Sequence, residues 1–266
     1  MAGIFFRENR SFRSYLFGGE PIGKTKQMYG WRGTIGLVKP TFRAGPLEAF
    51  IRFMPDGVCV VPRYIGIRAG TEKEFEDTLA IADQRVGELA ELKVDLALLQ
   101  GAPPYMLRGV EFDKDYTRGL EKKHGIRVMS TTMVQIQALE LLGVKSMVGL
   151  TYFRDDFNPK FANFFEQAGF KVVAMKGVDV PFSDVGKMPV EEIYAKAKKL
   201  FVDSGGGDCL YLLGAGWDCL AAIAPLERDL DTVVLTNVPA DVWASFKHLR
   251  IHEPIEGFGR LLAELP

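Results

Sequence analysis

Residues 95–109 read DLALLQGAPPYMLRG, and this stretch decides the fold prediction. The apolar run 96–99 stops at Gly101, and two prolines follow. A short apolar run ended by glycine and proline is typical of a buried parallel strand that delivers a loop at its carboxyl end. Residues 209–218, CLYLLGAGWD, repeat the pattern with Gly214 at the strand end. Ligands of open α/β sheets bind at this end of the strands, so we expect a ligand between the two loops.

The composition is that of an ordinary globular chain. It is 47% apolar and 25% charged over 266 residues, with a net charge of −1, which is enough for one large α/β core or two smaller ones. The balanced charge creates no field that would attract nucleic acid or an acidic membrane. We therefore expect neither nucleic acid nor a membrane as a partner.

The cysteines and histidines indicate the compartment and the cofactor chemistry. The three cysteines form no CxxC pair and the three histidines no HxxxH pair, so we predict a reduced, cytoplasmic protein without a metal site. No apolar run reaches 18 residues, which argues against a transmembrane helix. The first residues lack the apolar centre of a signal peptide.

Strand and helix patterns alternate along the chain. Thr71 with Glu74 forms a capping box, Thr131 and Thr132 are expected to cap a helix, and the segments 103–105 and 237–240 are expected to be loops. The alternation predicts βαβ units with parallel sheets. Strands are predicted at 34–38, 57–63, 95–100, 126–129, 146–151, 171–175, 209–213 and 232–235, and helices at 47–53, 72–92, 113–123, 133–142, 158–168, 190–202, 220–228 and 241–249.

An internal echo predicts two half-chains of like fold. The strand and Phe-Arg pair ending at Arg43 recurs at Arg154, 111 residues later, and Gly101 recurs as Gly214, 113 residues later. Nearly equal offsets indicate duplicated α/β halves with a ligand cleft between them. Four strand-end loops would meet there, at 39–43, 101–105, 152–156 and 214–218. We assign 31–130 plus 244–266 to the first half, 131–243 to the second, and 1–30 to an N-terminal extension.

The order and spacing of several motifs resemble the Asp/Glu racemase superfamily, in its arylmalonate decarboxylase and maleate cis-trans isomerase branch. The motifs are IGLVKP (35–40), LLQGAPPYMLRG (98–109), STTMVQIQALELLGVKSMVGLT (130–151), RDDFNPKF (154–161) and VVLTNVPADVW (233–243). The resemblance implies two pseudo-symmetric halves and cofactor-free chemistry at a carbon next to a carboxylate. It also implies cysteine thiols at two mirror-related strand ends.

This chain departs from the family at those reactive positions. The two cysteine positions fall on Gly101 and Gly214, and the nearest thiol is Cys219, which is more typical of a buried small hydrophobe. Hydroxyl donors after Gly101 are replaced by Ala102 and a proline. The tyrosine that the resemblance implies in the second half falls on Phe153, with Tyr152 beside it. The family's cysteine mechanism therefore does not carry over.

Other residues can bind an anion in the predicted cleft. Arg43 and Arg154 could clamp a carboxylate, although Arg154 could instead pair with a neighbouring aspartate. Backbone N–H groups at Ala102, Ala215 and Arg154 could hold carboxylate oxygens or make ordinary turn hydrogen bonds. Lys39 lies in the first loop, where a solvated lysine is the usual outcome.

Proton transfer is assigned to Asp218 and Tyr152. Asp218 follows Trp217, and an apolar ring beside a carboxylate raises its pKa, as a general acid requires. Its alternative role is to cap the helix that follows, and Trp217 is either a wall for an aromatic substrate or core. Gly101, Phe153 and Gly214 complete the expected binding set.

We therefore predict a cofactor-independent enzyme that acts on a small or aryl-substituted carboxylic acid, as a decarboxylase-type lyase. A catalytically silent carboxylate-binding protein is one alternative, motivated by the missing thiols. An isomerase or racemase with a non-cysteine acid/base pair is the other. The predicted partner is a small-molecule carboxylate, and a homo-oligomer is possible.

Overall fold

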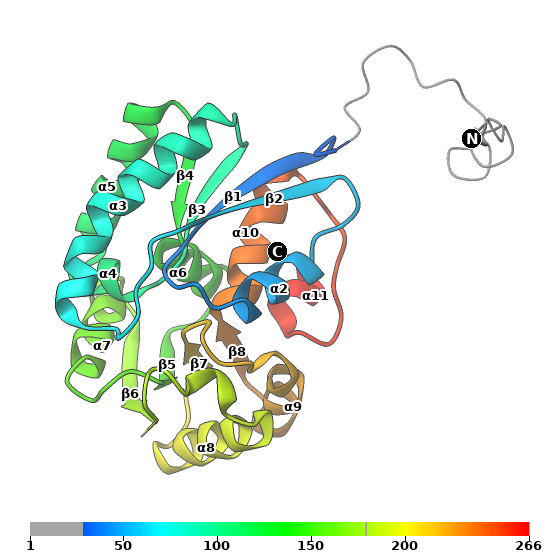
Figure 1. Cartoon of the computed structure of the whole chain (residues 1–266). Coiled ribbons are helices and arrows are strands. Elements are labelled where there is room, and N and C mark those ends of the chain that lie inside the picture. The colour runs from blue at the N-terminus through cyan, green and yellow to red at the C-terminus, as the bar shows by residue number, and fades with distance from the viewer. Residues whose placement is uncertain (1–28, 179, 266) are drawn as a thin grey trace, which may run out of the picture.

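The computed structural model describes residues 29–178 and 180–265, which form two parallel sheets of four strands each (Figure 1). The first sheet has the order β2-β1-β3-β4 and the second the order β6-β5-β7-β8. All strand pairs are parallel. The strands are β1 (Gly33–Lys39), β2 (Val58–Tyr64), β3 (Leu96–Leu99), β4 (Arg127–Ser130), β5 (Ser146–Thr151), β6 (Lys171–Gly177), β7 (Cys209–Leu213) and β8 (Val233–Thr236).

Helices connect the strands and cover both sheets. Figure 1 shows α6 and α10 in the middle of the molecule, between the two sheets. The helices are α2 (Gly45–Arg52), α3 (Glu72–Glu91), α4 (Pro103–Met106), α5 (Val110–His124), α6 (Thr131–Leu141), α7 (Asn158–Gln167), α8 (Val190–Asp203), α9 (Leu220–Leu230), α10 (Asn237–Leu249) and α11 (Arg260–Glu264), with a 3-10 turn at Val185–Lys187.

The equal strand orders confirm the predicted duplication. In each sheet a central strand, β1 or β5, lies between an outer strand and the strand that ends in glycine, β3 or β7. The carboxyl ends of β1, β3, β5 and β7 therefore meet where the two halves face each other. The fold class is confirmed, whereas the exact division of the chain between the halves stays a prediction. The extension 1–30 lies outside the described residues except for its last two.

Local sequence signals explain most element boundaries. Thr71 and Glu74 form the expected capping box at the start of α3, with Glu74 N–H donating to Thr71 Oγ1 over 3.3 Å. The four residues of β3 are all buried, as a central parallel strand requires. Helix α10 is buried from Asn237 to Phe246, because it packs against α6, α2 and α11.

Three local predictions were wrong. Residues 103–106 form the short helix α4, because proline fits the first positions of a helix. Residues 237–240 are the first turn of α10. The N-cap of α6 is Ser130, whose Oγ accepts a hydrogen bond from Met133 N–H over 3.2 Å, whereas the side chains of Thr131 and Thr132 bond to aspartates elsewhere.

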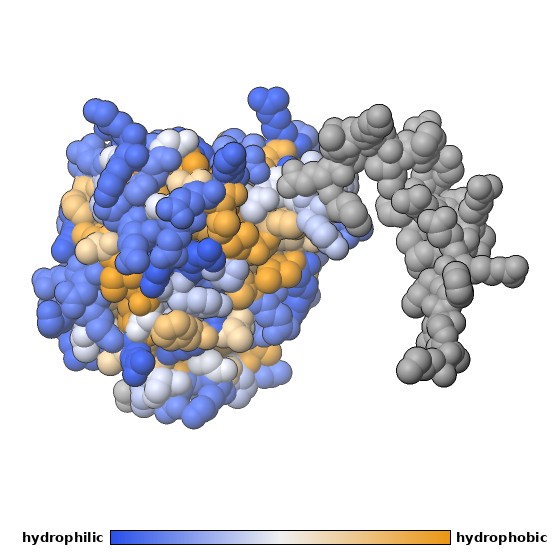
Figure 2. Space-filling model, turned by 45° about the horizontal axis from the view of Figure 1, so that its top comes forward, coloured by the Kyte–Doolittle hydropathy of each residue, from blue (hydrophilic) through white to orange (hydrophobic). Residues whose placement is uncertain are grey.

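The surface carries both polar and apolar groups. Figure 2 shows hydrophobic side chains exposed in separate groups among hydrophilic ones on one face of the molecule. Among the described helices, none has the length and apolar character needed to cross a membrane.

Candidate active site

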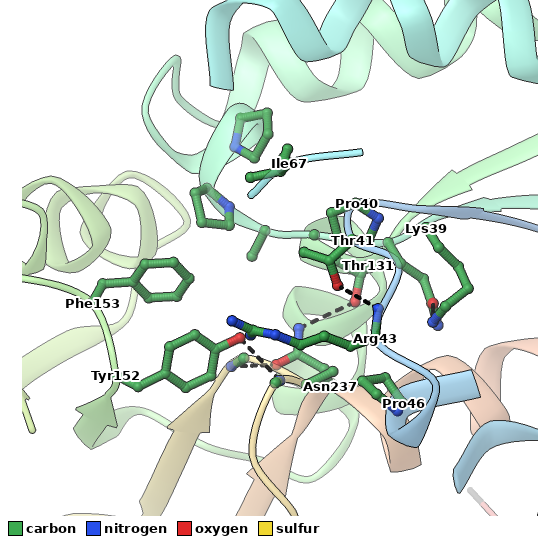
Figure 3. Close-up of a pocket in the computed structure, with 18 of the residues that line it drawn as sticks. Lys39, Pro40, Thr41, Arg43, Pro46, Ile67, Thr131, Tyr152, Phe153 and Asn237 are labelled. Atoms are coloured by element: carbon green, nitrogen blue, oxygen red, sulfur yellow. Dashed lines mark hydrogen bonds between the residues drawn. The ribbon is translucent and has the colours of Figure 1, made fainter. Parts of the chain in front are cut away.

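A cavity of about 60 Å³ lies where the strand ends of the two halves meet, and we call it the central cavity. One wall is apolar, formed by prolines and by aromatic and aliphatic side chains. The opposite side carries an arginine, a phenol and amide groups (Figure 3). All four predicted strand-end loops contribute. The lining residues are Lys39, Pro40, Thr41, Arg43, Pro46, Ile67, Phe75, Gln100, Gly101, Ala102, Pro103, Pro104, Thr131, Tyr152, Phe153, Phe182, Gly214, Ala215, Gly216, Asn237 and Asp241.

The two glycines at the strand ends have no room for a side chain. Gly101 has φ +96° and Gly214 has φ +106°, values that L-residues rarely adopt. A Cβ at Gly101 would lie 2.8 Å from Pro40 Cβ, and a Cβ at Gly214 would lie 2.5 Å from the hydroxyl oxygen of Tyr152. The side chains that the resemblance places at these positions are therefore excluded by conformation and by contact.

Tyr152 fills the space beside Gly214. Its hydroxyl oxygen accepts a hydrogen bond from Gly216 N–H over 3.0 Å, and its ring meets that of Trp217 edge to face, with centroids 5.2 Å apart. Burial raises the pKa of Tyr152 to about 12, against the opposing effects of the Gly216 hydrogen bond and of Arg43. The phenol is therefore protonated at neutral pH and can donate its proton into the cavity.

Arg43 approaches the same glycine loop from the first half. A Cβ at Gly216 would lie 2.6 Å from Arg43 Nη1 and 2.8 Å from the Tyr152 hydroxyl, so the guanidinium and the phenol both lie against this backbone (Figure 3). Arg43 also donates a hydrogen bond to the Phe182 carbonyl, and its Cζ lies 4.3 Å from the centre of the Phe182 ring. These contacts hold a cation at the cavity wall.

A buried polar network lies behind the cavity and was missed by the sequence analysis. Gln100 accepts a hydrogen bond from Lys39 Nζ over 3.3 Å and donates one to Asp241 over 2.9 Å. Thr131 donates to Asp241 over 2.7 Å. Asn237 donates to Thr131 over 3.4 Å and accepts from Gly214 N–H over 2.6 Å. The network thus connects α10 to the glycine loop of the cavity.

Burial shifts the charges of this network toward neutrality. The Lys39 side chain is buried, with the residue only 2% exposed, so the expectation of a solvated lysine was wrong. Burial lowers the pKa of Lys39 to about 8, although Asp241 opposes the shift. Burial raises the pKa of Asp241 to about 7, against the hydrogen bonds from Thr131 and Gln100. The alternation of Ile35, Leu37 and Lys39 along β1 was the signal that Lys39 points inward.

The central cavity brings together seven of the ten predicted site residues. They are Arg43, Gly101, Ala102, Tyr152, Phe153, Gly214 and Ala215.

Three predicted residues lie elsewhere. Arg154 is exposed and pairs with Asp156 over 2.6 Å, so it does not face Arg43 across the cavity. Trp217 and Asp218 line a neighbouring cavity, with Trp217 buried and Asp218 exposed. The N-cap of α9 is Cys219 and not Asp218.

The described cysteine and metal-binding groups do not form a reactive centre. Cys219 is buried, its Sγ lies 3.6 Å from Thr236 Oγ1, and burial raises its pKa to about 12, so a thiolate there is disfavoured at neutral pH. Among the described residues, no three histidine, cysteine, aspartate or glutamate side chains are grouped to hold a metal ion.

The fold and the site define a class: a duplicated α/β protein with a small cavity between the strand ends of its halves. Comparison with known proteins identifies the family within this class. The family model for arylmalonate decarboxylase matches residues 35–262, and the chain belongs to this family.

Individual relatives agree in fold but are distant in sequence. Arylmalonate decarboxylase of Bordetella bronchiseptica is 23% identical over 216 residues, which cover 79% of this chain and 88% of the relative. A liganded double mutant of arylmalonate decarboxylase superposes with a TM-score of 0.80 at 19% identity, covering 87% of this chain and 99% of the other. Maleate isomerase of Pseudomonas putida has a TM-score of 0.81 at 14% identity, covering 88% and 99%.

Proposed function

We propose that this protein is a cofactor-independent, decarboxylase-type lyase for a small or aryl-substituted carboxylic acid, and that Tyr152 supplies the proton. The observation that carries the proposal is the position of the Tyr152 hydroxyl, which occupies the space that a side chain at Gly214 would need. Membership of the arylmalonate decarboxylase family supports the reaction class. The phenol thus stands in the place where the resemblance implies a thiol.

The proposed reaction uses groups that line the central cavity. The substrate carboxylate that stays on the product binds the Arg43 guanidinium by charge-assisted hydrogen bonds. The bond between the α-carbon and the second carboxylate breaks, CO₂ leaves, and the electron pair remains on the α-carbon. Tyr152 transfers its hydroxyl proton to that carbon, and the resulting phenolate is stabilised by Gly216 N–H and Arg43. A proton from solvent then restores the phenol.

Between the two predicted catalytic residues, the geometry favours Tyr152. Tyr152 lines the central cavity together with Arg43, whereas Asp218 is exposed in the neighbouring cavity. A carboxylic acid on the solvent side of the glycine loop is poorly placed to protonate a carbon next to Arg43.

Proton NMR in D₂O with a panel of malonates, maleate-like diacids and aryl-substituted acids tests this function. We expect loss of one carboxylate and one deuterium at the α-carbon of the product. Tyr152→Phe removes the proton donor with little change in shape, and we expect it to lower the rate about 10²-fold or more. Asp218→Asn is expected to cause a much smaller loss. Full activity of the Tyr152→Phe protein would overturn the role of Tyr152.

The absence of room for either thiol favours one alternative, a catalytically silent carboxylate-binding protein. Stoichiometric binding by calorimetry, with no product after long incubation, would support that alternative. Deuterium that enters recovered substrate without carbon loss would indicate an isomerase or racemase. We also propose a cytoplasmic location, a small-molecule carboxylate as the partner, and a homo-oligomer as a state to test by light scattering.

A further inference from the structure

A second cavity, which we call the side cavity, lies against the central cavity and is larger. Its volume is about 410 Å³, compared with about 60 Å³ for the central cavity. The two share a wall made of residues that line both: Arg43, Pro46, Gly214, Ala215 and Gly216. A ligand held at this wall can therefore reach both cavities.

The volumes set a limit on where the substrate fits. A cavity that holds benzene measures about 150 Å³, and pockets for larger ligands measure about 300–1,000 Å³. The central cavity, at about 60 Å³, accommodates a carboxylate and its α-carbon but not a further ring. The side cavity, at about 410 Å³, has room for a ring and a substituent.

The side cavity presents a hydrogen-bond donor that lacks a partner. Trp217 lines it and is only 4% exposed, and within the described part of the chain its Nε1 has no hydrogen-bond partner. An indole N–H can only donate, and leaving it unpaired when buried is costly. A ligand with an acceptor oxygen would satisfy it.

The start of α9 adds further donors to the same cavity. Leu220, the first residue of α9, lines it together with the N-cap residue Cys219. Cys219 makes no side-chain capping bond in this part of the described chain, and the first N–H groups of a helix have no partner within the helix. Both features favour an acceptor on the ligand.

The charges around the side cavity balance. Arg43 and Arg52 contribute two cations, and Glu48 and Asp218 contribute two carboxylates. Arg52 already lies 3.7 Å from Glu48. A neutral acceptor, such as an amide or carbonyl oxygen, therefore fits this lining better than a second anion.

We infer that the substrate is an extended carboxylic acid that spans both cavities. Its reacting end lies in the central cavity at Arg43, and its ring, ending in a neutral acceptor oxygen, lies in the side cavity beside Trp217. This inference rests on the proposed function for the identity of the reacting end. It adds the substrate class: an acid with a bulky substituent that is apolar along its length and carries an acceptor at its tip.

Calorimetry with three malonates tests the inference: methylmalonate, benzylmalonate and (4-carbamoylbenzyl)malonate. Binding is measured in the Tyr152→Phe protein, so that no acid is consumed. We expect benzylmalonate to bind roughly 10- to 100-fold more tightly than methylmalonate, because a ring is buried. The carbamoyl group is expected to add about threefold to tenfold. Equal affinity of the three acids, or no binding by any of them, overturns the inference.

Substitutions identify the cavity that is used. Ser183 is exposed and lines the side cavity, so Ser183→Trp should fill it and remove the advantage of both benzyl acids while methylmalonate binding is kept. Lys187→Trp is the matched control, because Lys187 is exposed nearby and is not among the lining residues. Trp217→Phe should remove only the gain from the carbamoyl group. Equal effects of Ser183→Trp and Lys187→Trp would contradict the inference.

The outcomes separate this inference from the proposed function. If the wild-type protein fails to decarboxylate any acid but the affinity order and the Ser183→Trp effect hold, the side cavity is a binding site and the reaction is wrong. If decarboxylation occurs but the order collapses, the reaction stands and the side-cavity inference fails.

Discussion

The hydroxyl oxygen of Tyr152 lies 2.5 Å from the point where Gly214 would carry a Cβ atom. Real Cβ atoms do not approach other atoms this closely, so a tyrosine in this position and a side chain at residue 214 exclude each other. The glycine at the strand end is thus a condition for the position of the phenol. This relationship connects the missing thiol to the group that we propose in its place.

Gly214→Ala should destabilise the protein because the new methyl group meets the Tyr152 ring and because φ is +106°. Overpacking typically costs about 1–3 kcal/mol, and the positive φ adds about 1 kcal/mol. Urea unfolding measures the loss. Gly143→Ala is the control, since Gly143 has φ +72° but open space around a Cβ; an equal loss in both variants would show that the contact with Tyr152 has no effect.

Truncating the tyrosine should relieve the clash. We expect Gly214→Cys to be less destabilising in a Tyr152→Ala background than in the wild-type protein, with a coupling free energy of about 0.5–3 kcal/mol. A double-mutant cycle in guanidinium chloride measures this quantity. Additive effects of the two substitutions would mean that the side chains do not compete for the same space.

Arg43 and Arg154 are equivalent in the internal repeat but should differ in their effect on turnover. Arg43 lines the central cavity, whereas Arg154 is exposed and paired with Asp156. A hydrogen bond to a charged group contributes about 1.5–3 kcal/mol, so Arg43→Ala should lower kcat/KM roughly 10- to 100-fold. Arg154→Ala should leave it near the wild-type value. Steady-state kinetics on an acid that the NMR panel identifies provides the comparison.

The stability of the protein should depend on pH through Asp241. Burial raises its pKa from 3.8 to about 7, so between about pH 4 and pH 7 the folded state binds more protons at this site than the unfolded state. The contribution to the free energy of unfolding is therefore full at low pH and falls as the pH rises through this range. Asp241→Asn should remove the decline in urea unfolding measured across pH 4–8. The same decline in the Asp241→Asn protein would contradict the assignment; Asp115→Asn, at an exposed position, is the control.

Lys39 should act in the opposite direction at higher pH. Burial lowers its pKa from 10.5 to about 8, so between about pH 8 and pH 10.5 the unfolded state binds more protons and stability rises with pH. Lys39→Met should remove that rise while keeping the volume of the side chain similar. Thermal unfolding from pH 7.5 to 10 measures the slope, and a rise that persists in the variant would exclude Lys39 as its source.

The central cavity shows how far strand ends can be predicted. The loops after β1, β3, β5 and β7 were predicted to meet, and they do. That prediction needed only parallel strands, whose carboxyl ends share one edge of a sheet, and a repeat that places the same edge in both halves. The partners of individual side chains were harder to predict, as Arg154 shows: it occupies the position equivalent to Arg43 but turns to solvent and Asp156.

The sequence by itself determined the class of fold, the duplication and the positions of the four loops. These follow from apolar periodicity, from glycine and proline at strand ends, and from two nearly equal offsets, all of which act between residues close in the chain. Only the tertiary structure decided that Lys39 is buried against Gln100 and Asp241 and that Tyr152 occupies the space beside Gly214. Those contacts join residues 61–141 positions apart, and their geometry depends on how the two halves pack, which no local pattern in the chain encodes.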